Sequence, residues 1–162
     1  MKQTADELRQ IIENIVPKLK QLPEPEIAQR PNPKKWARKE ILGHLIDSAS
    51  NNQQKFVRVM QQPSLEFPGY AQDDWVDLQN WANADWIEMV DLFAAYNRHI
   101  AYLIETIDPK FHSHTITIEG VGPFTLGFIM PDYVEHLSIM CSKFSRTLNW
   151  KINSSMFTTL EN

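Results

Sequence analysis

The sequence predicts an all-α protein: a four-helix bundle with a long crossover between the second and third helices and a small β-hairpin before the fourth. Three observations predict this fold class. Apolar residues recur at steps of three and four residues in four separate stretches. A segment that contains Pro, Gly and two Trp, residues 61–83, separates the second stretch from the third. One short stretch alternates between polar and β-branched residues.

The first two helices are predicted from apolar periodicity over residues 4–22 and 35–60. Thr4 and Glu7 have the spacing of a capping box, which predicts the start of the first helix. Pro23 predicts its end, because proline cannot donate the backbone hydrogen bond that would continue the helix. A link that contains further prolines leads into the second helix.

The crossover is predicted from its length. Residues 61–83 exceed what a tight turn between antiparallel neighbours requires, so we expect them to cross the bundle. Asn83 is placed to cap the third helix, and the Asp108-Pro109 pair is placed to end it.

A short β element and the last helix complete the chain. Residues 113–118 alternate in the manner of a strand, and Gly120 just beyond them predicts a turn, so this segment is expected to be a strand or hairpin arm. Thr125 is placed to cap a fourth helix that continues through Leu148. Pro131 lies inside that pattern, so the helix either kinks there or begins close to it.

Composition limits the classes of function. Sixteen basic against twenty acidic residues give a formal net charge of -4, which argues against a nucleic-acid-binding surface. No apolar stretch approaches the roughly 20 residues of a membrane span, and the N-terminus has no apolar signal core. We therefore expect one cytoplasmic domain over residues 1–162, with neither nucleic acid nor a membrane as a partner.

Histidines inside two predicted helices are the main candidates for chemistry. At 100° per residue, Glu40, His44, Asp47 and Asn51 fall on one face of the second helix, a polar stripe beside an apolar one. His136 lies in the fourth helix. Histidines that face one cavity from two bundle helices can form a metal site. The alternative is that each is an ordinary core or surface histidine.

Two further groups are weaker candidates. His112 and His114 would share one face of a strand and could hold a metal, or could simply lie on a solvent-facing hairpin. Trp75, Trp81 and Trp86 could line a ligand pocket, or could pack the crossover against the bundle.

Three segments resemble the DinB superfamily. Residues 36–48 resemble its second-helix motif, with the spacing Trp-x3-Glu-x3-His-x2-Asp. Residues 70–76 resemble its crossover segment, and residues 125–126 together with 132–137 resemble its last helix. The resemblance extends over about residues 34–150 with the segments in the family's order.

The resemblance implies a four-helix bundle, often dimeric, that binds a divalent metal such as Ni or Zn. It also implies three histidine ligands, one from the second helix and a His-x3-His pair from the last. Transferred to this chain, the first ligand is His44 and the second is His136, whereas the third position holds Met140. A thioether is a soft ligand that suits copper(I) better than nickel or zinc.

Met140 leaves the implied site short of the three protein ligands that are usual for catalytic zinc. Asp47, Asp132, Glu135 or a water molecule could supply the missing ligand, and the sequence selects none of them.

Ala37 is a second departure from the family pattern. It occupies a position where the family tends to have Ser or Thr as a helix cap. We therefore expect Glu40 to lack its capping-box partner and to be free to face the cavity.

Two hypotheses of function remain open. In the first, the protein is a metal-assisted transferase or hydrolase that acts on a small, thiol-conjugated substrate, with Glu40 and Asp47 as candidates for a catalytic acid or base. In the second, it is a non-catalytic dimeric bundle that has lost the metal and binds at most a small apolar ligand. His44 and His136 favour the first hypothesis, and Met140 favours the second.

Overall fold

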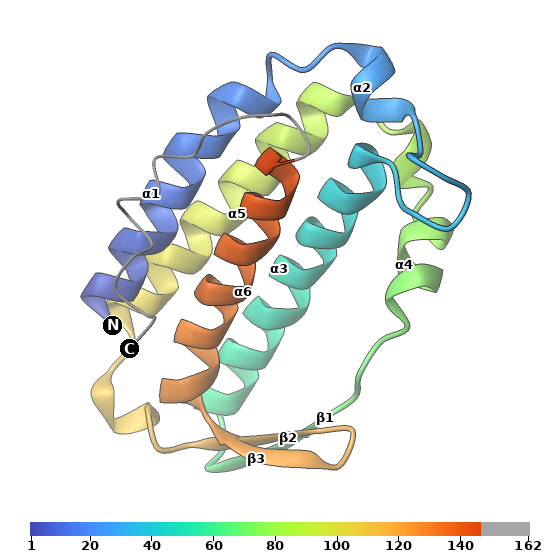
Figure 1. Cartoon of the computed structure of the whole chain (residues 1–162). Coiled ribbons are helices and arrows are strands. Elements are labelled where there is room, and N and C mark those ends of the chain that lie inside the picture. The colour runs from blue at the N-terminus through green and yellow to red at the C-terminus, as the bar shows by residue number, and fades with distance from the viewer. Residues whose placement is uncertain (147–162) are drawn as a thin grey trace.

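The computed structural model describes residues 1–146 and confirms the predicted four-helix bundle. The bundle consists of four long helices: α1 (Lys2–Leu19), α3 (Arg38–Met60), α5 (Trp86–Thr106) and α6 (Leu126–Arg146). Figure 1 shows the four helices side by side, with α5 in contact with both α1 and α3. The helix end predicted at Leu148, and the last part of the domain predicted over residues 1–162, lie outside the described residues.

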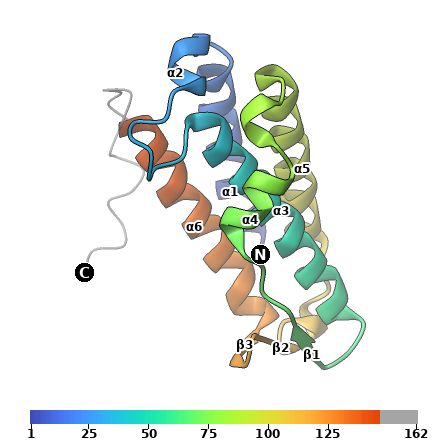
Figure 2. The same cartoon turned by 90° about the vertical axis from the view of Figure 1, so that its right-hand side faces the viewer.

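Shorter elements connect the long helices. A single-turn helix, α2 (Glu24–Ala28), lies between α1 and α3. The predicted crossover contains the strand β1 (Ser64–Phe67), the helix α4 (Gln72–Leu78) and the 3-10 turn η1 (Trp81–Asn83). Both views place α4 beside α3, so the crossover covers one side of that helix (Figures 1 and 2).

The predicted hairpin is confirmed and gains a third strand. Strands β2 (Thr115–Ile118) and β3 (Val121–Thr125) pair antiparallel. Strand β1 of the crossover adds to β2 in parallel, with Ser64 opposite Thr115. The sheet lies at the end of the bundle where α3 ends and α6 begins (Figure 1). A four-residue strand between prolines gives no periodic signal, which is why the sequence did not predict β1.

Several predicted helix boundaries are wrong. The capping box of Thr4 and Glu7 does not form, because α1 already begins at Lys2 and the backbone N–H of Ala5 donates to the carbonyl of Met1. Asp85, and not Asn83, caps α5: its side chain accepts a hydrogen bond from the backbone of Glu88 at 2.9 Å.

Asn83, the residue predicted to cap α5, lies in the 3-10 turn η1 instead. Pro131 lies inside α6, which begins five residues earlier at Leu126. The tertiary contacts of Trp86 explain where α5 starts. Its indole is 5% exposed and donates to the carbonyl of Leu19 at 2.8 Å, which ties the start of α5 to the end of α1.

The core is apolar and continuous between the long helices. Its largest fully buried side chains come from α1, α2, α3, α5, α6 and the sheet: Leu8, Ile12, Leu19, Ile27, Leu42, Phe56, Phe93, Ile100, Ile104, Ile116, Leu126 and Met130. Cys141 is also buried, and burial raises the pKa of its thiol to about 12, so it serves packing and is not a nucleophile at neutral pH. None of the helices between residues 1 and 146 is long and apolar enough to cross a membrane.

The crossover approaches the backbone of α3 closely at Gly43. A Cβ atom built on Gly43 would lie 2.2 Å from Cγ of Trp81, well inside van der Waals contact. Trp81 therefore rests directly on the α3 backbone. Only glycine leaves space for the indole there.

We predict that Gly43→Ala destabilises the protein. In an open helix, replacing glycine with alanine stabilises by about 0.5–1 kcal/mol, whereas overpacking typically costs about 1–3 kcal/mol. Because the indole ring has to move, we expect the overpacking cost to dominate. Chemical unfolding followed by circular dichroism measures the free energy of unfolding, and tryptophan fluorescence reports the displacement of Trp81. A net gain in stability would show that the crossover does not rest on Gly43.

Candidate functional site

The polar face predicted on α3 is buried. Glu40 is 1% exposed, His44 5%, Asp47 2% and Asn51 9%. Buried polar side chains on a bundle helix require partners, so the contacts of each one show its role.

Glu40 fixes the start of α3. Its carboxylate pairs with the guanidinium of Arg30 through two hydrogen bonds, of which the one from Nε to Oε2 measures 2.9 Å. Oε2 also accepts from the backbone N–H of Ala37 at 2.7 Å. Burial by itself would raise the pKa of Glu40, but these hydrogen bonds hold it below the ordinary value.

The expectation that Glu40 is free to face a cavity is therefore wrong. The alanine at position 37 removes the side-chain half of the capping box, because it has no oxygen to offer. The other half forms nonetheless, since it needs only the backbone N–H of Ala37. The guanidinium of Arg30, ten residues earlier in the chain, donates hydrogen bonds to both oxygens of the same carboxylate.

Asp47 holds the crossover. Its Oδ1 accepts a hydrogen bond from Nε2 of Gln79 at 2.7 Å, and its Oδ2 accepts one from Nε1 of Trp81 at 3.2 Å. Burial raises the pKa of Asp47 in spite of these two bonds. The hydroxyl of Tyr70 is also affected: burial, with a smaller contribution from the charge of Asp47, raises the pKa of Tyr70 to about 12.

His44 is the member of the polar face whose ring is left without a hydrogen bond. Its Nδ1 is buried and has no partner among residues 1–146. The ring of Trp36 lies against the imidazole, with 5.2 Å between the ring centroids. Burial lowers the pKa of His44, and the positive charge of His136 lowers it further, whereas the negative charge of Asp73 opposes both.

His136 is exposed on α6, and Met140, one turn later, is half-buried. The helices α3 and α6 that carry the two predicted ligands pack against each other. In the part of the chain that the structure describes, no three His, Cys, Asp or Glu side chains form a group that could hold a metal ion. The donor set therefore fits a metal in part: it has two imidazoles, one with an unpartnered nitrogen, and lacks a third ligand.

The hairpin histidines do not form a pair on a strand. Both precede β2: His112 follows the 3-10 turn η2 (Pro109–Phe111), and His114 lies two residues later. Nδ1 of His114 lies 2.8 Å from the carbonyl oxygen of Val59, and its ring packs edge-on against Phe111. The prediction that they share a strand face is wrong, because the chain is still turning at these residues.

The three clustered tryptophans have separate contacts. Trp81 covers Gly43 and binds Asp47, whereas Trp86 is buried at the start of α5. Trp75 is 36% exposed and packs against Tyr70 at 4.9 Å between ring centroids, with the ring planes tilted by 56°. The first two therefore attach the crossover and α5 to the bundle.

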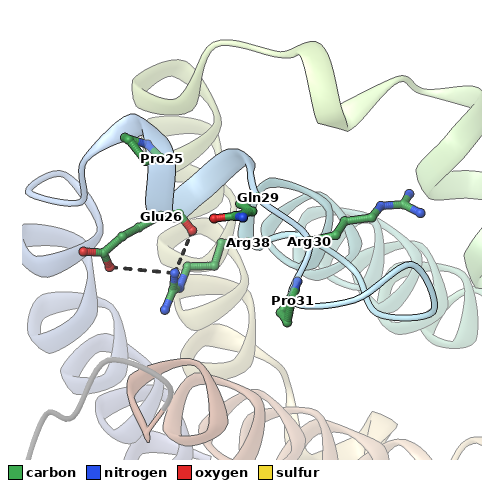
Figure 3. A pocket seen from close by; sticks show the side chains of 6 residues that line it. All are labelled: Pro25, Glu26, Gln29, Arg30, Pro31 and Arg38. Atoms are coloured by element: carbon green, nitrogen blue, oxygen red, sulfur yellow. Dashed lines mark hydrogen bonds and ion pairs between the residues drawn. The ribbon is translucent and has the colours of Figure 1, made fainter.

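An open surface hollow of about 410 Å³ lies around α2 and the start of α3 (Figure 3). Six residues line it: Pro25, Glu26, Gln29, Arg30, Pro31 and Arg38. Its two arginines are engaged with carboxylates, Arg30 with Glu40 and Arg38 with Glu26. Both arginines of the hollow are therefore already paired with carboxylates. The hollow does not include His44 or His136.

Comparison with known proteins identifies the family. A family model of the DinB superfamily matches residues 2–138. The chain belongs to the DinB superfamily. No curated protein matches this chain.

Among solved structures, this DinB-superfamily protein is similar to YfiT from Bacillus subtilis, described as "a probable metal-dependent hydrolase with an unusual four-helix bundle topology". The TM-score is 0.67 and the identity 20%, and the match covers 93% of this chain and 91% of YfiT. At this identity the likeness concerns the fold. It confirms the bundle topology that the DinB resemblance implies.

We predict that Glu40→Gln weakens the fold by about 1–3 kcal/mol at pH 7, the usual cost of losing charged hydrogen bonds at a buried site. The pKa of Glu40 is lowered in the folded state, so its stabilisation is present above the ordinary pKa of 4.5 and is lost as the pH falls through the folded value. The difference between the two proteins should therefore shrink as the pH falls below the ordinary pKa of 4.5. Urea unfolding at several pH values measures it.

Glu24→Gln is the matched control, because Glu24 pairs with Lys39 but is 67% exposed. Its effect should stay below about 0.5 kcal/mol. Equal effects of the two substitutions would contradict the structural role assigned to Glu40.

Proposed function

We propose that this protein binds a divalent metal, Ni or Zn, through His44 and His136, and acts on a small molecule as a metal-assisted hydrolase or transferase. The observation that carries the proposal is the buried, unpartnered Nδ1 of His44, on a helix that packs against the α6 helix of His136. A buried polar atom without a partner costs about 1–3 kcal/mol. A ligand at this site would offset that cost.

The family and the fold support the same proposal. The chain belongs to the DinB superfamily, and the structurally similar YfiT is described as a probable metal-dependent hydrolase. A divalent metal, when bound, lowers the pKa of a coordinated water or thiol and orients it for attack.

The residues of this chain would prepare His44 for that role. A histidine must be neutral to act as a ligand, and burial, together with the charge of His136, favours the neutral ring by lowering the pKa of His44. Trp36 fixes one side of the ring. We assign positioning roles to Glu40 and Asp47, because their carboxylates are occupied by Arg30 and by the crossover respectively.

One observation favours a second candidate function. With Met140 in the third position of the family's ligand set, the site could have lost its metal and kept only binding of a small apolar ligand. In that case the protein would be a non-catalytic bundle. The homodimer that the family resemblance implies is compatible with both candidates and stays a prediction.

We predict that His44→Gln weakens binding of Ni(II) or Zn(II) at least about tenfold, since loss of even an outer-shell partner commonly costs 10–100-fold. Isothermal titration calorimetry on protein purified without an affinity tag measures the dissociation constant. His99→Gln is the control, because His99 is exposed on α5. Less than about a tenth of an equivalent of bound metal, with no change in melting temperature when metal is added, would favour the non-catalytic bundle.

We predict that Met140→His raises the affinity for Ni(II) or Zn(II) at least about tenfold, because it supplies the missing imidazole one turn after His136. The same titration measures it. Unchanged affinity would mean that residue 140 does not point toward the pair formed by His44 and His136.

A further inference from the structure

We propose that Trp36 controls access to the imidazole of His44, and that the carboxylate of Glu40 holds Trp36 in place by binding both ends of the segment from Arg30 to Ala37. This segment belongs to the link between α2 and α3. The inference rests on the proposed function, because it takes His44 as the group that receives the ligand.

The contacts of Trp36 are the first argument. Its indole is half-buried, yet it does not pack against the apolar core, in contrast to that of Trp81. Its ring lies against His44, with 5.2 Å between the ring centroids and 40° between the ring planes. Within residues 1–146, the indole N–H has no hydrogen-bond partner. The indole therefore covers the imidazole and does not anchor the link in the core.

The binding of both segment ends by Glu40 is the second argument. The guanidinium of Arg30 donates two hydrogen bonds to the carboxylate, and the one from Nε to Oε2 measures 2.9 Å. The backbone N–H of Ala37 donates to the same Oε2 at 2.7 Å. One buried carboxylate thus closes the segment into a loop, and Trp36 lies next to the second of the two points where the loop is held.

The middle of the segment has little freedom of its own. Pro31 and Pro33 each fix one backbone φ angle. Asn32 forms a turn, because its side-chain and backbone oxygens accept hydrogen bonds of 3.0 Å from the backbone N–H groups of Lys34 and Lys35 respectively. A segment that is stiff between its ends moves mainly at those ends. The hydrogen bonds at the two ends therefore decide where the indole lies.

Loss of Arg30 would loosen this arrangement. The side chain of Glu40 is buried, whereas that of Arg30 is 45% exposed. Removal of the guanidinium leaves a buried charge that, among the described residues, keeps the hydrogen bond from Ala37 alone. Such a charge is unfavourable, and it regains water when the segment moves away. Local opening of this kind requires less free energy than unfolding of the bundle, so we expect the indole to leave the imidazole while the helices stay packed.

The position of the indole also affects what can bind. His44 is 5% exposed with Trp36 against it, so the indole sets how much of the imidazole a small molecule can reach. We therefore assign Trp36 as a specificity-determining residue. Glu40 and Arg30 are positioning residues that act through it.

The test measures the reactivity of individual side chains toward two small reagents. Diethyl pyrocarbonate modifies accessible imidazoles, and peptide mass spectrometry gives the rate for each histidine. His99, which is exposed on α5, is the reference within the same molecule. Iodoacetamide reports on global opening, because Cys141 is the single cysteine of the chain and is buried in the core. Neither reagent requires a bound metal.

Three substitutions should expose His44 selectively. Trp36→Ala removes the cover, whereas Arg30→Gln and Glu40→Gln release it. Each should raise the modification rate of His44 relative to the reference histidine at least about threefold, less than the complete loss of one charged hydrogen bond would allow. The alkylation rate of Cys141 should stay at the value of the natural protein, because the bundle remains folded.

Two substitutions are matched controls. Trp36→Phe keeps an aromatic ring over the imidazole. Glu24→Gln removes a carboxylate that pairs with Lys39 but is 67% exposed. Both should leave His44 as protected as it is in the natural protein.

Two results would overturn the inference. An unchanged rate for His44 in Arg30→Gln and Glu40→Gln would show that the segment does not hold Trp36. A rise for His44 only together with Cys141 would show that the substitutions unfold the bundle. Either result leaves the proposed function standing, because metal titration of the natural protein tests it separately. If the natural protein binds neither Ni(II) nor Zn(II) while the variants expose His44 as expected, the proposed function fails and control of access by Trp36 stands.

Discussion

The carboxylate of Asp47 attaches the crossover to the helix bundle. It is buried at 2% exposure on α3, and each of its oxygens accepts a hydrogen bond from the end of the crossover, one from Gln79 and one from Trp81. A buried charge is costly unless it is hydrogen-bonded, so removal of the crossover would leave this group unsatisfied. The close approach of Trp81 to Gly43 adds a steric constraint at the same place. Together they determine where α4 lies.

The polar side chains on this face of α3 have different structural roles. Glu40 completes the first turn of the helix and binds Arg30, and Asp47 binds the crossover. His44 lies between them, buried and without a hydrogen bond at Nδ1 in the described part of the chain. Because its neighbours are occupied, His44 is the group on this face that is available to a ligand.

The elements could be predicted from the sequence to different extents. The long helices follow from apolar periodicity, and the hairpin from alternation and glycines. The strand β1 could not be predicted, because it depends on pairing with β2 about fifty residues later. The role of Glu40 was missed for a similar reason: Arg30 belongs to an irregular link whose path the periodicity does not define. The start of α1 at Lys2 was decided by a backbone hydrogen bond to Met1, and the start of α5 at Trp86 by the Asp85 cap together with the tertiary contact of the Trp86 indole.

The sequence by itself determined the bundle, the place of the crossover and hairpin, and the family, and it singled out His44 and His136 as candidate ligands. These are local properties, carried by periodicity and by spacing within single helices. Only the tertiary structure decided which polar groups are satisfied. Asp47, for example, finds its partners 32 and 34 residues away in the chain. Burial and hydrogen bonding between distant segments depend on how the helices pack, and no spacing within one helix encodes that arrangement.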